Sequence, residues 1–142
     1  MPTIAYPRNR WLLLGLGLIV VALGLASRKY PELFPAALGT YPGDALWAVT
    51  AYLAIAFILP SMPVWKVAGI ALVVSYLVEL SQLVQLPWFN GLRSTRVGHL
   101  LLGQGFDRFD LVALAIGVGL AASVDAICEW NVRRASEANE SQ

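Results

Sequence analysis

The sequence predicts an all-α fold, a four-helix transmembrane bundle with a long polar loop between the third and fourth helices. Of the 142 residues, 58% are hydrophobic and only 13% are charged, whereas soluble domains carry about 25% charged residues. Four long apolar runs are separated by polar segments, as in chains that cross a bilayer several times. All 5 tryptophans fall near a predicted helix end, where membrane proteins place an interfacial aromatic belt.

The four spans are predicted at 11–27, 44–59, 66–85 and 110–127. Pro60 and Pro63 end the second span and Pro87 stops the third, because proline lacks the N–H group that an α-helix requires. We expect 1–142 to form a single integral membrane domain. Its polar tail, 130–142, is expected to be flexible.

A cleaved signal peptide is the competing interpretation of the first apolar run. Basic residues precede its apolar core, and the small residues Gly24 and Ala26 precede Ser27, as at a cleavage site. Three further spans favour a transmembrane helix, because they already commit the chain to the membrane. The alternative stays open on the sequence alone.

Charge and cysteine content exclude several classes of protein. Ten Lys and Arg residues against nine Asp and Glu leave a net charge of +1, which is not the basic footprint of a nucleic-acid-binding protein. Cys128 is the single cysteine and no Cys/His cluster has zinc spacing. No nucleophile elbow or paired carboxylate motif indicates a hydrolase. We therefore expect no nucleic-acid partner, no metal and no cofactor, and no residue receives a catalytic assignment.

Ionisable residues gather on one predicted membrane face. Four alternating spans place the segment after the first span on the same side as the segment after the third. Ionisable side chains at membrane depth are costly and usually have a partner or a task, so this face is the predicted ligand-binding site. Its candidate residues are Arg28, Asp44, Glu79, Gln82, Arg93, Arg96, His99 and Asp110.

Residue spacing predicts which helix faces point into the bundle. Ser75, Glu79 and Gln82 are four and three positions apart, so they share one stripe that should face other helices. Small residues at four-residue spacing allow close helix contact in a membrane. Two such sets occur in the last span, Ala113, Gly117 and Ala121, and Ala115, Gly119 and Ser123.

The acidic candidates also have structural interpretations. Asp44 and Asp110 lie at helix starts, where they would serve as N-caps or as partners of the helix dipole. Glu79 would form a structural ion pair with Arg93 or Arg96 if the loop folds back over the end of the third span. A ligand-binding role and a structural role are both open for these residues.

Two further features favour simple structural roles. His99 has no second His or Cys at metal-ligand spacing, which argues against a metal site. Gly103 and Gly105 are expected to be turn glycines, because no strand and helix flank them as in a phosphate-binding loop.

Four stretches carry a resemblance to a known family: Ser27-Arg28-Lys29-Tyr30-Pro31, Gly43-Asp44-Ala45-Leu46-Trp47, Glu79-Leu80-Ser81-Gln82, and the loop from Arg93 through Gly98-His99 to Phe106, followed by Asp110-Leu111. They resemble the bacterial membrane family called domain of unknown function 2809, over about 11–122. The resemblance implies a small bacterial inner-membrane protein of uncharacterised activity. The order of acidic residues and arginines is remotely similar to VanZ-like proteins, although Trp47 and Tyr52 stand near the positions where that family usually has His and Tyr.

Counting the basic residues on each side of the membrane does not decide the orientation of the protein. With the termini inside, five basic residues lie on each side, and those near the termini have fewer acidic neighbours in sequence. We expect both termini in the cytoplasm, because such residues report topology better under the positive-inside rule.

Three functions are compatible with these observations. The first is binding of an anionic envelope component, a lipid headgroup or lipid-linked cell-wall precursor, with Arg93 and Arg96 on the phosphate because guanidinium groups match phosphate geometry. The second is an interfacial enzyme acting on a lipid-linked phosphate, with Glu79 or His99 as general base. The third is a structural accessory subunit of a membrane complex.

Overall fold

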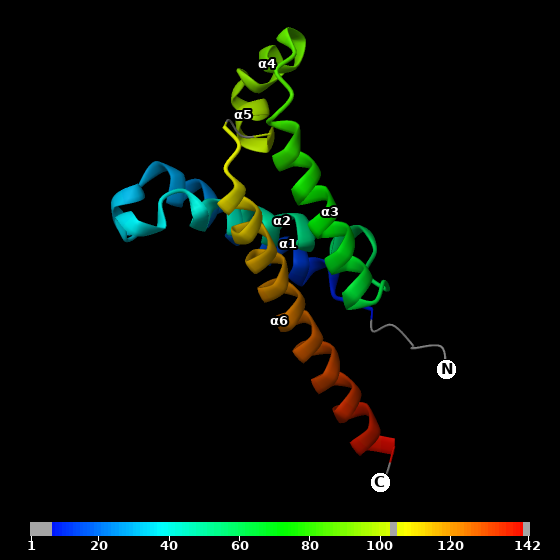
Figure 1. Ribbon diagram of the computed structural model, residues 1–142. Coiled ribbons are helices and arrows are strands. Elements are labelled where there is room, and N and C mark those ends of the chain that lie inside the picture. Colours follow the sequence, from blue (N-terminus) through cyan, green and yellow to red (C-terminus); the bar gives the residue numbers. More distant parts are fainter. Residues whose placement is uncertain (1–6, 103–104, 141–142) are drawn as a thin grey trace.

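The structure is a computed structural model that describes residues 7–102 and 105–140, and these residues form helices and connecting segments without strands. Gly103, one of the expected turn glycines, lies outside the described residues. The elements are α1 (Arg10–Lys29), the short 3₁₀ helices η1 (Pro31–Leu33) and η2 (Ala36–Leu38), α2 (Tyr41–Ile58), α3 (Val64–Ser81), α4 (Pro87–Arg93), α5 (Arg96–Leu102) and α6 (Arg108–Glu140) (Figure 1).

Four helices, α1, α2, α3 and α6, are long and apolar enough to cross a membrane, which agrees with the predicted number of spans. At about 1.5 Å per residue, α1 is about 30 Å long and α2 and α3 are about 27 Å long. These lengths match a hydrocarbon core of about 30 Å. The 33 residues of α6 extend about 50 Å, so its C-terminal part continues beyond the bundle.

The segment between the third and fourth spans differs from the expectation. The predicted long loop between the third and fourth spans instead contains α4 and α5, and Pro87 begins α4, where a proline at the first helical position costs no hydrogen bond. The tail is helical as far as Glu140, and its flexibility stays a prediction. Arg133 pairs there with Glu129 and Arg134 stacks on Trp130, and contacts at four-residue spacing stabilise a helix.

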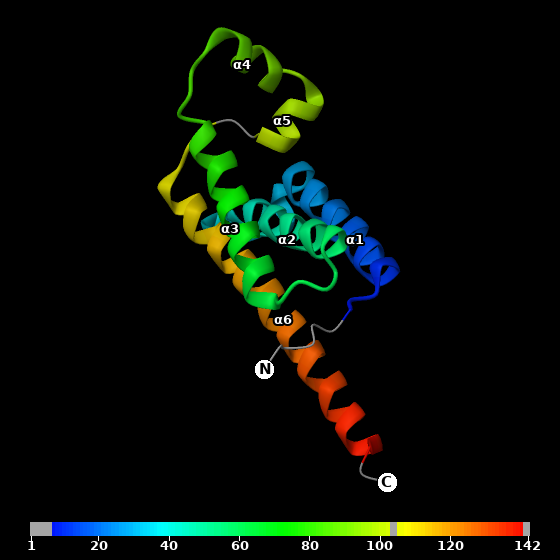
Figure 2. The ribbon, with the colours of Figure 1, turned by 90° about the vertical axis from the view of Figure 1, so that its right-hand side faces the viewer.

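The four spanning helices alternate in direction along the chain, and α2 contacts the other three. α2 packs against α1, α3 and α6, and α3 also packs against α6. The η1–η2 segment and the α4–α5 hairpin lie at the end where α6 begins, and the turn between α2 and α3 lies toward the opposite end (Figures 1 and 2). The polar segments before α2 and before α6 are therefore on the same side of the bundle, as predicted.

Small side chains dominate the interior of the bundle and large apolar side chains lie on its outside, as in membrane proteins. The buried core consists mainly of small side chains with a few larger ones: Ala48, Tyr52, Ala56, Val67, Ala71, Ala113, Leu114 and Val118. Large apolar side chains such as Leu18, Val73 and Leu120 are exposed. A water-soluble protein would bury these residues, whereas lipid solvates them and leaves close packing of small residues to hold the helices together.

Gly117 marks the closest contact between α2 and α6. A Cβ atom at this position would lie 2.2 Å from the carbonyl oxygen of Ala45 and 3.0 Å from the Cβ of Ala48. A Cβ on Gly119 would meet no atom within 4 Å, and Ser123 is exposed. Only the first of the two predicted sets of small residues therefore faces a neighbouring helix.

Gly117→Leu should destabilise the fold strongly, whereas Gly119→Leu should leave it close to the parent. Overpacking at a tight contact costs about 1–3 kcal/mol or more, and at Gly117 the obstructing atoms belong to the α2 backbone. Thermal denaturation of the two variants in detergent compares them directly. Equal stability of the two variants would contradict the assignment of this contact.

Reporter fusions after Arg134 and within 90–98 should lie on opposite sides of the membrane, because one spanning helix, α6, lies between the two positions. Fusions in the η1–η2 segment provide the control and should share the side of 90–98. Reporters that place Arg134 and 90–98 on the same side would exclude the four-span topology.

Candidate functional site

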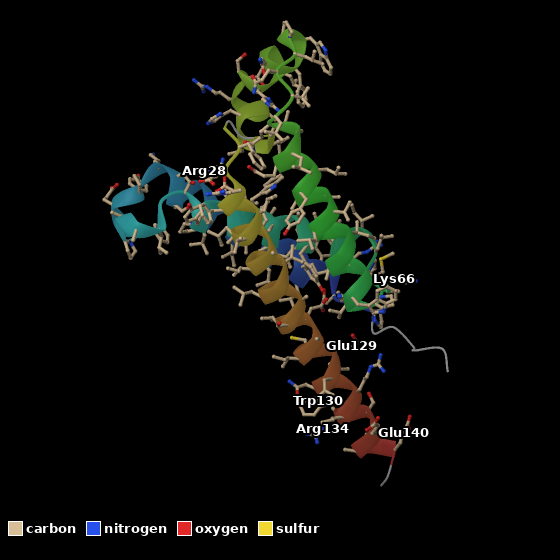
Figure 3. The ribbon with its side chains drawn as sticks, viewed as in Figure 1. Arg28, Lys66, Glu129, Trp130, Arg134 and Glu140 are labelled. Carbon is tan, nitrogen blue, oxygen red and sulfur yellow. The ribbon has the colours of Figure 1, made fainter. Side chains whose placement is uncertain are left out.

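A cavity of about 350 Å³ lies at the end of the bundle where α6 begins. All four spanning helices contribute to its wall, together with α5 and the segment that contains η1 and η2. Six of the eight predicted site residues line this cavity: Arg28, Asp44, Glu79, Gln82, His99 and Asp110. Figure 3 shows Arg28 at this end of the bundle and Lys66 toward the other end.

The ends of the helices position these side chains. Asp44 lies in the first turn of α2 and Asp110 in the first turn of α6, where the positive end of the helix dipole favours a carboxylate. Neither is an N-cap, since Thr40 precedes α2 and the Asp107 side chain accepts the N–H of Phe109 at 3.0 Å. The dipole interpretation therefore fits both acids, and the capping interpretation does not.

The stripe predicted on the third span is confirmed. Ser75 and Glu79 are buried along α3, and Gln82 is buried at its C-cap. Because α3 ends at Ser81 rather than at the predicted residue 85, Glu79 lies within the last helical turn. It is closer to the end of its helix than the sequence suggested.

The cavity contains more hydrogen-bond acceptors than donors. Glu79 is 6% exposed and Asp110 is 8% exposed. Gln82 Nε2 donates to Glu79 Oε2 at 3.0 Å, and Arg28 Nη2 lies 3.5 Å from Asp44 Oδ1. Four buried oxygens on the cavity-lining residues have no hydrogen-bond partner of good geometry within the described part of the chain: Asp44 Oδ2, Glu79 Oε1, Gln82 Oε1 and Asp110 Oδ1. The side chains of Asp44 and Asp110 approach each other, and the Asp107 N–H approaches Glu79 and Asp110.

A group that donates hydrogen bonds would complement these oxygens. Carboxylates accept hydrogen bonds only, and buried acceptors without a partner are unfavourable. Among residues 7–102 and 105–140, no three His, Cys, Asp or Glu side chains form a group that could hold a metal ion. The arrangement thus suits an organic donor such as an ammonium group.

The two remaining candidates, Arg93 and Arg96, do not line the cavity. Arg93 is buried at the end of α4, where its guanidinium donates to the carbonyl oxygens of Ser81 and Val84 and stacks 4.3 Å from the Phe89 ring. It therefore binds one carbonyl oxygen of the last residue of α3 and one in the turn that follows this helix. Arg96 opens α5 and is exposed.

The expected ion pair of Glu79 with either arginine is not present. Within the described residues, the ion pairs are Arg8–Asp125, Arg28–Asp44 and Arg133–Glu129. Gly105, in contrast, has the positive φ of 87° expected of a turn glycine.

A second polar cluster at the opposite end of the bundle was not predicted. Arg8 forms hydrogen bonds of 2.9 and 2.7 Å with Asp125 and donates to the carbonyl oxygens of Pro60 and Met62. Tyr52 donates to Asp125 at 2.5 Å. The network joins the segment before α1, the turn after α2, and α6. Asp125 is a charged residue inside the predicted span 110–127, and that signal could have identified it.

The charge of Arg8 is stable in this position. Burial on its own lowers the pKa of an arginine, but the hydrogen bond and the negative charge of Asp125 outweigh it and raise the pKa of Arg8 above its usual value. The guanidinium therefore remains charged over the physiological pH range. The contacts that Arg8 makes with Asp125 and with the turn after α2 do not depend on a change in the charge of Arg8.

Replacing Arg8 by methionine should destabilise the fold by about 3 kcal/mol, because Asp125 loses its cation while largely buried. The value lies at the low end for a buried pair since the Asp125 side chain is 16% exposed. The double variant Arg8→Met/Asp125→Leu should recover part of this loss. Arg10→Met is the control, because Arg10 is exposed. Denaturation in detergent that left Arg8→Met as stable as Arg10→Met would contradict a structural role.

Comparison with known families matches residues 33–118 to the family described as "Protein of unknown function (DUF2809)". The matched region extends from the last residue of η1 to the middle of α6, so it includes all described cavity-lining residues except Ser27, Arg28 and Pro31. No solved structure matches the chain. The remote similarity to VanZ-like proteins stays a prediction. Since the match covers more than half of the sequence, the chain belongs to the DUF2809 family.

Proposed function

We propose that the protein is a membrane receptor for an ammonium-bearing ligand, which it binds in the cavity at the start of α6. The observation that carries this proposal is the set of four buried, unpartnered acceptor oxygens on Asp44, Glu79, Gln82 and Asp110. An ammonium group has three N–H donors and a positive charge, so it complements both the geometry and the sign of charge of these residues.

This proposal revises the anionic ligand expected from the sequence. That expectation assigned phosphate binding to Arg93 and Arg96, which lie outside the cavity wall. The wall contains three carboxylic acids and one arginine, Arg28, so its acidic side chains outnumber the arginine. A purely anionic ligand would meet repulsion from the acids, whereas a ligand with an ammonium group is attracted by them.

The cavity does not continue through the bundle. Leu114 and Val118 follow Asp110 on the buried face of α6, and Ala48 follows Asp44 on α2. Apolar packing thus separates the acids from the Arg8–Asp125 cluster at the other end. This one-sided arrangement supports a binding function more than passage of a solute across the membrane.

The enzyme alternative has one specific observation in its favour. His99 and Glu79 line the same cavity, so a ligand held there would contact a candidate general base. Product formation from a bound phosphate ester would support this alternative. The accessory-subunit function would be supported if no ligand binds and the bundle is stable only with a partner protein.

We also propose that the protein lies in the bacterial inner membrane with both termini in the cytoplasm. Arg8 and Arg133 turn out to have the acidic partners Asp125 and Glu129, so the presence of acidic partners does not distinguish the two ends. The orientation is supported instead by the proposed ligand, since the cavity would then open to the outer leaflet. The reporter fusions described above decide the orientation as well as the topology.

Ethanolamine should raise the melting temperature of the purified protein in detergent, and inorganic phosphate should not. A ligand at 100 times its dissociation constant stabilises the folded state by about 2.7 kcal/mol. Glu79→Gln and Asp110→Asn should each weaken the binding at least tenfold, which corresponds to about 1.4 kcal/mol. Glu137→Gln, in the exposed tail of α6, is the matched control and should bind like the parent.

The stability of the unliganded variants tests the structural alternative in the same experiment. Glu79→Gln should retain the stability of the parent, because Glu79 has no cationic partner among the described residues. A large loss of stability in Glu79→Gln that Arg96→Gln partly restores would instead indicate the structural ion pair. Stabilisation by phosphate but not by ethanolamine would overturn the proposed ligand chemistry.

A further inference from the structure

The α4–α5 hairpin is a compact unit that is fastened to the end of α3. A Cβ atom on Gly98 would lie 1.9 Å from the carbonyl oxygen of Leu92, so the two short helices cross with their backbones in contact. Thr95 Oγ1 accepts the N–H of Gly98 at 3.0 Å across the junction. Arg93 attaches the hairpin to the carbonyl oxygens of Ser81, at the end of α3, and of Val84, just beyond it. The hairpin is thus held at the cavity end of the bundle.

The surface of the hairpin is apolar where a water-exposed loop would be polar. Trp88 is 70% exposed and Val97 is 66% exposed. Three leucines extend this apolar surface: Leu86, Leu92 and Leu101. Exposed apolar patches of this kind mark sites of interaction.

Position and composition identify the bilayer as the partner of this surface. Five residues, 82–86, join α3 to the hairpin, and a fully extended segment of that length reaches only about 17 Å. The hairpin therefore stays close to the ends of the membrane-spanning helices. A tryptophan, several leucines and the exposed cation of Arg96 are the residues that interfacial helices place at the level of the lipid headgroups.

The same hairpin also forms one wall of the cavity. His99, Leu100, Leu101 and Leu102 of α5 face the acids of α2, α3 and α6 across it. These acids lie within about one turn, or about 5 Å, of the ends of their helices, which is the level of the headgroup region. The cavity therefore lies beside the lipid interface and is bounded by an element that contacts it.

From this arrangement we infer that the α4–α5 hairpin lies in the headgroup layer of the bilayer and that the ligand is the headgroup of an aminophospholipid. The ammonium group lies among the acids of the cavity wall, Asp44, Glu79 and Asp110, and Arg28 takes the phosphate. The Arg28 side chain is 39% exposed and 3.5 Å from Asp44, so it retains free N–H donors. This inference rests on the proposed function and adds the source of the ligand.

The position of the hairpin is tested by spin labels on single cysteines in liposomes of phosphatidylethanolamine and phosphatidylglycerol. Cys128→Ser removes the native cysteine, and a label is then placed through Val97→Cys. Leu77→Cys on the exposed face of α3 is the lipid reference, and Glu137→Cys is the water reference. The Val97 label should be accessible to oxygen and protected from a water-soluble nickel complex. Nickel accessibility equal to that at Glu137 would overturn the interfacial position.

The source of the ligand is tested by comparing three probes in detergent: ethanolamine, phosphoethanolamine and short-chain phosphatidylethanolamine. We expect the lipid to bind at least tenfold more tightly than phosphoethanolamine, because its chains remain in contact with the apolar hairpin. Arg28→Gln should weaken both phosphate-bearing probes several-fold relative to ethanolamine, which lacks the phosphate. Equal affinity for lipid and phosphoethanolamine would indicate a soluble ligand and overturn this inference alone. Failure of ethanolamine to bind would overturn the proposed function as well.

Discussion

The contact between α2 and α6 determines where the polar residues of this bundle meet. The two helices run in the same direction, and Gly117 allows the backbone of α6 to approach the carbonyl oxygen of Ala45. With the helices in this register, the first turns of both lie at one end and Tyr52 lies beside Asp125 at the other. A side chain at position 117 would separate the helices and disturb both polar clusters. Close packing of a glycine is therefore the constraint on which the cavity depends.

The two polar clusters differ in how completely their groups are satisfied. Arg8 donates to Asp125 and to two carbonyl oxygens, and Asp125 also accepts from Tyr52. Such a cluster compensates for the cost of burying charge. At the other end of the bundle, four acceptor oxygens of the cavity lack a donor within the described residues. Because of this contrast, we assign a structural role to the Arg8–Asp125 cluster and a ligand-binding role to the cavity.

In the proposed arrangement, the α4–α5 hairpin lies between the cavity and the lipid headgroups. Lipid-facing side chains on the spanning helices are large and apolar, and the exposed residues of α4 and α5 continue this surface at the end of the bundle. Residues of α5 also line the cavity. A headgroup and its acyl chains would thus contact different sides of the same short element, which makes an amphiphile a better match to this region than a small solute with no apolar part.

Hydropathy and spacing were sufficient to identify the spans and the buried stripe of α3. Apolar length is a local property of the chain, and the positions of Ser75 and Glu79 follow from helical periodicity alone. For the same reason, six site residues could be placed at one end of the bundle before any packing was known. Segments that follow one another through alternating spans must return to the same side of the membrane.

The partners of the charged side chains could be determined only from the tertiary structure. Arg93 was expected to approach Glu79, but α4 forms in the predicted loop and directs the guanidinium to carbonyl groups at the end of α3 and just beyond it. Arg8 and Asp125 are 117 positions apart in sequence, and no local pattern relates them. Local sequence decides where a helix forms and which face is apolar. Which charged side chains become neighbours depends on which helices pack together. In lipid, that packing depends on the fit of small side chains between the helices.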